Sequence, residues 1–500
     1  MDERVDLAMT LSMPLSRMYT LTTSLFTSTF GQPSPTSPTF APSVKSMDSR
    51  YASAGDKRNT LQVPSIYDRG FIDPDTPQEA YSKKNYMDNT EWQLIFSDEF
   101  NNDGRTFRPG DDPFWEAVDL RYRVTNNLEW YDPAAITTAN GSLIITLSKQ
   151  QTHDALYRGG MMTTWNKFCF TGGMVETSVV LAGSDNVSGL RSAVWTMGNL
   201  GRAGYGASLE GMWPYTYDAC DVGTVANQTR NGQPIAATDD GDPMNGGALS
   251  YLQGQRLSRC TCPGESHPGP MHSDGTYVGR SAPEIDIFES TITGDPLSGQ
   301  VLQSSQWAPF NNAYTWFNDS FTIQNTTTTT SNPYKGDVWQ QTTSCITDCD
   351  PEGYELTGNK FMVYGLQYKP GFDDAYISWS ANGKLSWTLK QAGLRADPTV
   401  EISARPVPQE PMYLIADLSM PLSDGIFVDL DHLTFPAHFK IDYIRVYQDP
   451  NAINYGCDPQ DFPTADYIEQ YLEAYTNPSL TTWQGDYKQP FPKNSYLGQC

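Results

Sequence analysis

The chain has 500 residues, of which 33 are basic and 58 acidic, so its net charge is -25. Such a charge repels nucleic acid and anionic membrane surfaces, which predicts no nucleic-acid partner and favours a neutral ligand. Aromatic residues make up 12% of the chain, with 28 Tyr and 12 Trp. Their flat apolar faces and polar edges suit sugars, and they suit a large β core equally well.

The cysteines and glycosylation sequons indicate an oxidising compartment. Eight cysteines permit four disulfides, whose pairing the sequence leaves open: Cys169, Cys220, Cys260, Cys262, Cys345, Cys349, Cys457 and Cys500. Five Asn-x-Ser/Thr sequons, at Asn140, Asn186, Asn227, Asn318 and Asn325, also point to a secretory lumen or the cell exterior. Cys260 and Cys262 precede His267 and His272, but Cys-x-Cys lacks the usual zinc spacing, so a disulfide-pinned loop is favoured. We predict no metal and no cofactor.

Residues 1–66 are rich in Ser, Thr, Pro and Met and have neither helical nor strand periodicity, which predicts a disordered tail. Leu7 to Phe30 is its most apolar part, but Ser and Thr interrupt it and Arg17 lies in the middle. A membrane span or a signal peptide needs a longer uninterrupted apolar run. We therefore expect neither here.

From Glu91 onward, short strand-like runs alternate with turns, which is typical of an all-β sandwich. The expected strands are 92–96, 142–147, 173–181, 192–197, 284–289, 360–368, 375–380, 384–389, 412–419 and 438–447. Asn382-Gly383 is a strong signal for a two-residue hairpin turn. Two long insertions, 198–282 and 309–354, are expected to form loops at one mouth of the fold, and only 464–475 suggests a helix of any length.

Three acids occur close together in the run Glu284-Ile-Asp-Ile-Phe-Glu289. In a regular strand Glu284 and Asp286 share one face, whereas Glu289 points to the other. A β-bulge near Ile287 and Phe288 would return Glu289 to the acidic face. Glu284 and Glu289 would then lie four register steps apart, roughly 13 Å between Cα atoms, and leaning side chains could bring their carboxyl groups to the ~5 Å that a retaining glycosidase needs. The spacing alone is weak, because a chain this acidic contains about one such triplet by chance, and a strand with a solvated acidic edge is the alternative.

The segments around this strand resemble glycoside hydrolase family 16, and within it the fungal group associated with synthesis of cell-wall β-1,6-glucan. Four segments match the family in order: 97–100 (SDEF), 173–176 (GMVE), 284–289 (EIDIFE) and 441–447 (IDYIRVY). The closer resemblance to the fungal group spans about 70–500, through 72–77 (IDPDTP), 127–133 (NLEWYDP), 165–169 (WNKFC) and 199–206 (NLGRAGYG). It implies a β-jelly-roll, concanavalin A-like sandwich over 67–455, with 456–500 as an extension packed on it and linked by a disulfide.

By resemblance, Glu284 is the nucleophile, Glu289 the general acid/base and Asp286 the carboxylate between them. Three acids on one face cannot all ionise freely, so we expect one, Glu289, to keep the proton that it gives to the leaving oxygen. The covalent glycosyl-enzyme could pass to water or to another glucan hydroxyl. The candidate sugar platforms are Trp195, Trp213 and Trp307, with core packing as the alternative for each.

The chain departs from the family pattern in two places. Where the family has Gly-Leu-Trp-Pro-Ala-x-Trp, this chain has GLRSAVW at 189–195, so Arg191-Ser192 replaces a Trp-Pro pair and we expect a weaker or charged aromatic surface. Members of the fungal group resemble type II membrane proteins of the secretory pathway, so membrane association is expected from the family although no clear anchor precedes Gly70.

The expected function is a β-glucan-acting hydrolase or transglycosylase of wall assembly. The rival is a glucan-binding scaffold that has lost turnover, which the Arg191-Ser192 departure supports. A third hypothesis, a structural wall protein held by disulfides, is weaker because it does not explain the two glutamates or the bulge between them.

Overall fold

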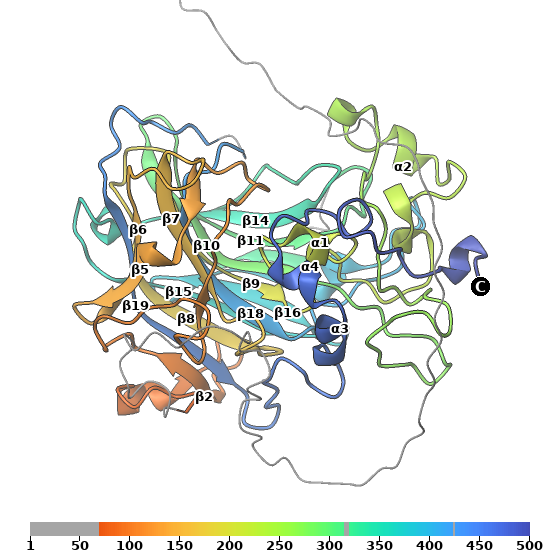
Figure 1. The fold of residues 1–500 in the computed structure, drawn as a ribbon, viewed down its shortest axis with the longest axis horizontal. Coiled ribbons are helices and arrows are strands. Elements are labelled where there is room, and N and C mark those ends of the chain that lie inside the picture. The colour runs from red at the N-terminus through yellow and green to blue at the C-terminus, as the bar shows by residue number, and fades with distance from the viewer. Residues whose placement is uncertain (1–69, 315–319, 424–425) are drawn as a thin grey trace, which may run out of the picture. The chain divides into compact units, whose positions relative to one another are not determined.

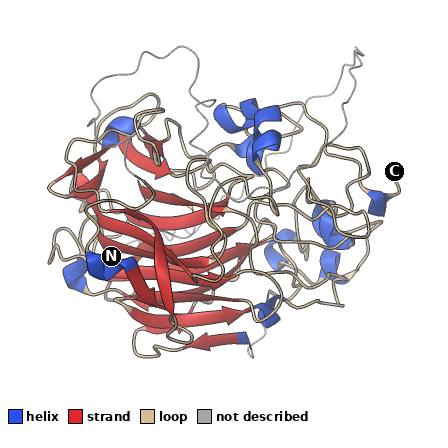
Figure 2. Ribbon diagram, turned by 90° about the horizontal axis from the view of Figure 1, so that it is seen from below, coloured by secondary structure: helices blue, strands red, loops and turns tan. Residues whose placement is uncertain are grey.

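The computed structural model describes residues 70–314, 320–423 and 426–500. The tail predicted over 1–66 lies outside these residues. Two antiparallel sheets dominate the described chain (Figure 1), and short helices and loops gather beside them (Figure 2). The predicted all-β sandwich is therefore confirmed.

The two sheets are built from strands that are far apart in the sequence. The first contains, in spatial order, β1 (Ser82–Lys84), β2 (Glu91–Asp98), β19 (Ala437–Gln448), β8 (Gly173–Val180), β15 (Met362–Lys369), β16 (Tyr376–Ala381), β17 (Lys384–Lys390) and β12 (Phe321–Ile323), with β6 (Ser142–Leu147) beside β19 and β5 (Ile136–Ala139) beside β6. The second contains β13 (Thr329–Ser331), β14 (Gln341–Asp348), β11 (Ser298–Trp307), β10 (Glu284–Thr293), β9 (Arg191–Gly198), β18 (Met412–Ser419), β7 (Tyr157–Thr163) and β3 (Glu116–Ala117), with β4 (Glu129–Tyr131) parallel to β7.

Alternating apolar residues of both sheets form the sandwich core. Val175 of β8 and Ile444 of β19 face it from the first sheet, and Val194 of β9 and Ile285 of β10 from the second; each is completely buried. Full burial of such a side chain contributes roughly 1.5–3 kcal/mol. This core covers one face of β10, and the side chains of the opposite face point away from it.

The local turn and helix predictions are confirmed. Asn382 and Gly383 have φ values of 50° and 69°, as a two-residue turn with two left-handed positions requires, and they join β16 to β17. The helix expected over 464–475 is present as α3 (Ala465–Gln470) and α4 (Leu472–Thr476). Two further short helices, α1 (Gly206–Leu209) and α2 (Ala236–Asp239), lie in the first insertion. Within the described ranges, every helix is too short or too polar to span a bilayer.

The second insertion is not only loop, so that prediction is wrong. It contains β12, β13 and β14, and β14 pairs with β11 along all eight of its residues. The sequence of β14, Gln-Thr-Thr-Ser-Cys-Ile-Thr-Asp, has almost no apolar alternation. β14 forms a strand because it pairs with β11, and this long-range pairing cannot be recognised from the alternation of apolar residues in the sequence.

Three disulfides form, not the four that eight cysteines permit. They join Cys169 to Cys457, Cys220 to Cys260 and Cys262 to Cys500, so two of them hold the segment after residue 455 to the rest of the chain. The expected disulfide-pinned loop at 260–262 is thereby confirmed. Cys345 and Cys349 are free thiols. Four residues along an extended chain span about 13 Å, too far for the Cα separation of a disulfide.

Candidate active site

A β-bulge in β10 places three carboxylates on one face of the second sheet. Opposite β11, Glu284 aligns with Gln306, Asp286 with Ser304 and Glu289 with Leu302, and the register shifts by one residue between Asp286 and Glu289. The pairing of β10 with β9 shifts in the same place. Because the partners on β11 alternate by two, all three acids share a face. The bulge predicted from the sequence is confirmed.

Glu284 is a half-buried carboxylate that an indole contacts directly. Trp213 donates its Nε1 hydrogen to Glu284 Oε2 at 2.6 Å. Burial raises the pKa of Glu284 well above its usual value, and the charges of Asp286 and Glu289 raise it further, while the bond from Trp213 opposes the shift. Glu284 therefore holds a proton more tightly than an exposed glutamate does.

Asp286 is almost completely buried between its neighbours. It accepts hydrogen bonds from Ser304 Oγ at 2.7 Å and from Gln306 Nε2 at 3.0 Å. Burial, followed by the charge of Glu289, raises the pKa of Asp286 to about 7, and a hydrogen bond with Glu284 opposes the rise. Burial therefore disfavours ionisation of both carboxyl groups, Glu284 and Asp286.

Glu289 has a different environment, because Arg191 lies against it. Arg191 Nη1 is 3.2 Å from Glu289 Oε1, and the side chains of Arg191 and Glu289 are 8% and 23% exposed. The cation favours the charged carboxylate. The sequence predicts that Glu289 keeps a proton, and in the structure burial raises the pKa of its neighbours Glu284 and Asp286. Arg191, expected to alter an aromatic surface, instead forms an ion pair with the acid itself.

The three candidate tryptophans have different surroundings. Trp213 is half-buried and bonds to Glu284. Trp195 aligns with Asp286 across β9 and β10, is 8% exposed and donates to Asp417 Oδ1 at 2.8 Å. Trp307 is completely buried in the sandwich core and donates to Thr343 Oγ1. A sugar cannot reach Trp307, so its assignment as a platform is wrong: the side chain at the end of β11 turns to the core face.

Sequence patterns missed Asp417 on β18, which borders the acids. Asp417 aligns with Ala193 of β9, and Ala193 aligns with Glu289. It accepts hydrogen bonds from Trp195 and from the Tyr131 hydroxyl, and burial raises its pKa to about 6. The sequence signal that could have indicated Asp417 is its position as the single acid in the apolar run Met-Tyr-Leu-Ile-Ala-Asp-Leu-Ser.

The segment after residue 455 packs on the same side of the second sheet as Trp195. Tyr475 and Trp483 join Trp195, Ile415 and Tyr413 in one buried apolar cluster that is separate from the sandwich core. In Figure 1, α3 and α4 lie beside β9 and β18. One end of the acid-bearing face is therefore covered by the C-terminal segment, which the Cys169–Cys457 disulfide holds.

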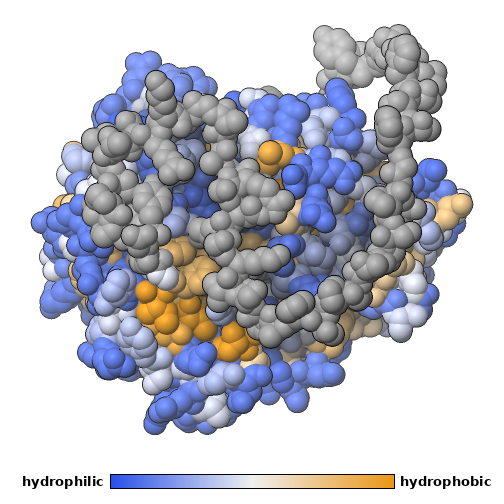
Figure 3. Space-filling view, turned by 60° about the horizontal axis from the view of Figure 1, so that its bottom comes forward, coloured by the Kyte–Doolittle hydropathy of each residue, from blue (hydrophilic) through white to orange (hydrophobic). Residues whose placement is uncertain are grey.

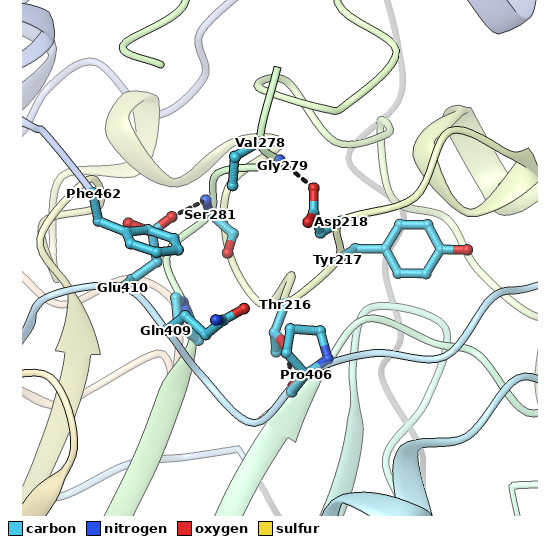
Figure 4. Close-up of a pocket in the computed structure, with 11 residues that line it drawn as sticks. Thr216, Tyr217, Asp218, Val278, Gly279, Ser281, Pro406, Gln409, Glu410 and Phe462 are labelled. Atoms are coloured by element: carbon cyan, nitrogen blue, oxygen red, sulfur yellow. Dashed lines mark hydrogen bonds between the residues drawn. The ribbon is translucent and has the colours of Figure 1, made fainter. Parts of the chain in front are cut away.

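A small cavity (Figure 4), lined by Ser281 and by Pro283, the residue before Glu284, cannot hold a sugar. It has a volume of about 20 Å³. Two hydrogen bonds join residues that line this cavity: the Gly279 amide donates to Asp218, and the Ser281 amide donates to Glu410. Because one water needs about 10–15 Å³, this space suits one or two waters.

Comparison with known proteins identifies relatives of this chain. The sequence model described as "Beta-glucan synthesis-associated protein SKN1/KRE6/Sbg1" matches residues 36–500. The chain is 42% identical over 436 residues to the beta-glucan synthesis-associated protein KRE6 of Candida albicans, covering 86% of this chain and 55% of that protein. The identity to KRE6 of Saccharomyces cerevisiae is 42% over 432 residues, covering 86% and 56%. The chain thus spans about half the length of these curated relatives.

Among solved structures, the catalytic domain of an endo-1,3-beta-glucanase (laminarinase) from Thermotoga petrophila is similar, with a TM-score of 0.39 and 19% identity. The match covers 72% of this chain and 99% of that domain. The laminarinase from Rhodothermus marinus matches with a TM-score of 0.39 and 16% identity, over 71% of this chain and 97% of its own.

Proposed function

Because the chain belongs to the family of beta-glucan synthesis-associated proteins SKN1/KRE6/Sbg1, we propose that it acts on β-glucan as a retaining glycoside hydrolase or transglycosylase in fungal wall β-1,6-glucan synthesis. One observation carries the proposal: the bulge in β10 that aligns Glu284, Asp286 and Glu289 on one face. A retaining mechanism needs two carboxyl groups that flank one glycosidic bond, and the shared face of Glu284 and Glu289 supports that requirement.

The two steps assign a role to each acid. Glu284 attacks the anomeric carbon while the glycosidic C–O bond breaks, and Glu289 gives its proton to the departing oxygen. In the second step Glu289 takes a proton from water or a glucan hydroxyl, whose oxygen displaces Glu284 from the anomeric carbon. Asp286 bonds to Glu284 and takes up or returns its proton. Trp213 orients Glu284 through the indole hydrogen bond.

The surroundings of the acids differ from those that the first step needs. Attack requires an ionised Glu284 and a protonated Glu289. In the structure burial raises the pKa of Glu284 and of Asp286, and Glu289 forms an ion pair with Arg191. We propose that a proton passes from the Glu284–Asp286 pair to Glu289 before the glycosidic bond breaks. This requirement slows turnover.

The Arg191–Glu289 ion pair also favours a second candidate function, a glucan-binding scaffold of wall assembly with little or no turnover. An acid that stays ionised cannot protonate a leaving group, whereas sugar binding needs only the shape and polarity of the face. Arg191 therefore decides between the two functions.

The secretory route is supported by the three disulfides, which persist in oxidising compartments. Association with a membrane is proposed from the family. The side of the molecule shown in Figure 3 is mainly hydrophilic, with one apolar patch below its centre and a smaller apolar spot above its centre. The net charge of -25 favours contact with a neutral polysaccharide over an anionic surface.

The test uses the full chain with labelled β-1,6- and β-1,3-glucan oligosaccharides. Chromatography measures cleavage and transfer, and a 2-deoxy-2-fluoroglucosyl donor traps the covalent intermediate for mass spectrometry. We expect the wild type to form products and a glycosyl ester on Glu284, and Glu284→Gln to form neither. Enzymatic function is refuted if the wild type gives no product, transfer or adduct. Glucan binding that Glu284→Gln and Glu289→Gln leave unchanged, without product, identifies the scaffold.

A further inference from the structure

Two exposed aromatic rings, one from each long insertion, form a pair at the surface. Trp339 lies in the loop before β14 and is 51% exposed, and Tyr251 of the first insertion is 37% exposed. Their ring centroids are 5.8 Å apart, and the ring planes meet at 72°. Single exposed apolar side chains are common and need no explanation. Two exposed aromatic rings brought together from separate insertions are instead a candidate binding surface.

Hydrogen bonds hold both residues of the aromatic pair in place without a ligand. The Tyr251 amide donates to the Val338 carbonyl at 2.9 Å, and the Tyr251 hydroxyl donates to the Asn245 carbonyl at 3.1 Å. The Trp339 amide donates to Asp337 Oδ1 at 2.7 Å. Because the two residues already have defined positions, a ligand that stacks on their rings orders little additional structure.

The aromatic pair lies at the end of the second sheet where Glu284 is found. Across β10, β11 and β14, Glu284 aligns with Gln306, and Gln306 aligns with Thr342. Hydrogen bonds follow this row, since Thr342 Oγ1 donates to Gln306 Oε1 and Gln306 Nε2 donates to Asp286. Two strand spacings place Thr342 about 10 Å from Glu284. Trp339 precedes Thr342 by three residues, so its Cα lies at most about 20 Å from that of Glu284.

The groups around the aromatic pair disfavour an anionic ligand. The Tyr314 hydroxyl donates to the carbonyl of Leu249, two residues before Tyr251. Burial raises the pKa of Tyr314, and the nearby charges of Asp242 and Asp337 raise it further. Two carboxylates beside the rings repel phosphate groups and acidic peptides, as does the net charge of -25. A sugar has no charge, can lay its C–H groups on an aromatic face and can donate its hydroxyl hydrogens to carboxylates.

We propose that Tyr251 and Trp339 form a second glucan-binding surface, separate from the acids, which holds a distant part of the β-glucan chain. The choice of ligand rests on the proposed action on β-glucan, and the surface serves an enzyme and a scaffold alike. A chain held at both places gains affinity because its second contact is intramolecular. The surface therefore favours long glucans over oligosaccharides that are too short to reach both the rings and Glu284.

The experiment measures, by titration calorimetry, how the full chain binds β-1,6- and β-1,3-glucan polymers, with Glu284→Gln in every protein to prevent turnover. Trp339→Ala should weaken polymer binding about 30-fold, the effect of truncating an anchoring Trp at a binding surface. Tyr251→Ala should weaken it as well. Both residues are exposed, so the Tm should stay unchanged. Phe372→Ala is the matched control, because it removes a ring that is 42% exposed between β15 and β16 of the first sheet, and it should keep full affinity.

The outcomes separate this surface from the proposed catalysis. Unchanged polymer affinity in Trp339→Ala and Tyr251→Ala would overturn the surface, even if the wild type forms products. Polymer binding that depends on Trp339, in a protein whose wild type gives no product or glycosyl adduct, would keep the surface and refute catalysis. Sedimentation tests the other occupant: a dimer that Trp339→Ala dissociates, with glucan binding unchanged, would assign the rings to contact between two copies of the chain and overturn the proposal.

Discussion

Replacing Trp213 with Phe tests whether the indole hydrogen bond prepares Glu284 for attack. The substitution keeps an aromatic ring beside Glu284 and removes only the Nε1 donor, which lies 2.6 Å from Glu284 Oε2. That bond lowers the pKa of Glu284 against the opposing effects of burial and of Asp286. Without it the pKa of Glu284 rises further, so a smaller fraction of Glu284, the proposed nucleophile, is ionised at any pH below the optimum.

The size of the effect follows from the hydrogen bond. A bond to a charged group contributes about 1.5–3 kcal/mol, which corresponds to a loss of roughly 10- to 150-fold in kcat/KM for Trp213→Phe. The acid limb of the pH–activity profile should move to higher pH, because this limb reports ionisation of the nucleophile in the free protein. Glucan affinity should change little, since the ring remains.

The assay measures kcat and KM for a labelled glucan oligosaccharide from pH 4 to 8. Trp130→Phe is the matched control, because Trp130 Nε1 also donates to a carboxylate, Asp119, at 2.7 Å, but away from the acid-bearing face. It should leave kcat/KM and both limbs unchanged. If Trp213→Phe has wild-type kcat/KM and an unmoved acid limb, Trp213 does not prepare Glu284 and the reasoning is refuted.

Three further predictions concern charge, cross-linking and pH. Arg191→Gln should raise kcat/KM at neutral pH about fivefold, because it removes an ion pair with Glu289 that is partly exposed and contributes about 1 kcal/mol. Steady-state kinetics measure this, and a fall in kcat/KM would contradict the prediction. Cys457→Ser opens the disulfide to Cys169 and should cost about 2–5 kcal/mol of unfolding free energy; an unchanged urea midpoint would exclude a stabilising role. Burial raises the pKa of Glu129 from 4.5 to about 7, so the folded protein binds the proton of this carboxyl group more tightly than the unfolded chain does. The protonated group stabilises the fold by about 3 kcal/mol. This contribution is complete below pH 4.5 and is lost as the pH rises through 7. Urea midpoints at pH 5 and 8 test this, and Glu129→Gln should flatten the difference.

Local sequence rules predicted the elements whose formation depends on neighbouring residues. The Asn382-Gly383 turn follows from two positive φ angles that these residues tolerate, and the strand at Ser142–Leu147 follows from its apolar alternation. The bulge in β10 could be stated in advance because one extra residue is the only way to return Glu289 to the face of Glu284.

Other features depended on contacts that no local pattern encodes. Trp307 and Trp213 have the same side chain but different surroundings. The pleat of β11 turns Trp307 into the core, whereas the path of a loop brings Trp213 to Glu284. Asp417 reaches the site only because β18 lies next to β9.

The sequence by itself determined an all-β sandwich with a bulged strand and three acids on one face, since alternation, turn residues and residue counts are local properties. The tertiary structure alone decided that Arg191 pairs with Glu289 and that burial raises the pKa of Glu284 and of Asp286. The physical reason is that protonation depends on burial and on the charges of neighbouring strands, which exist only after β9, β10 and β11 have come together.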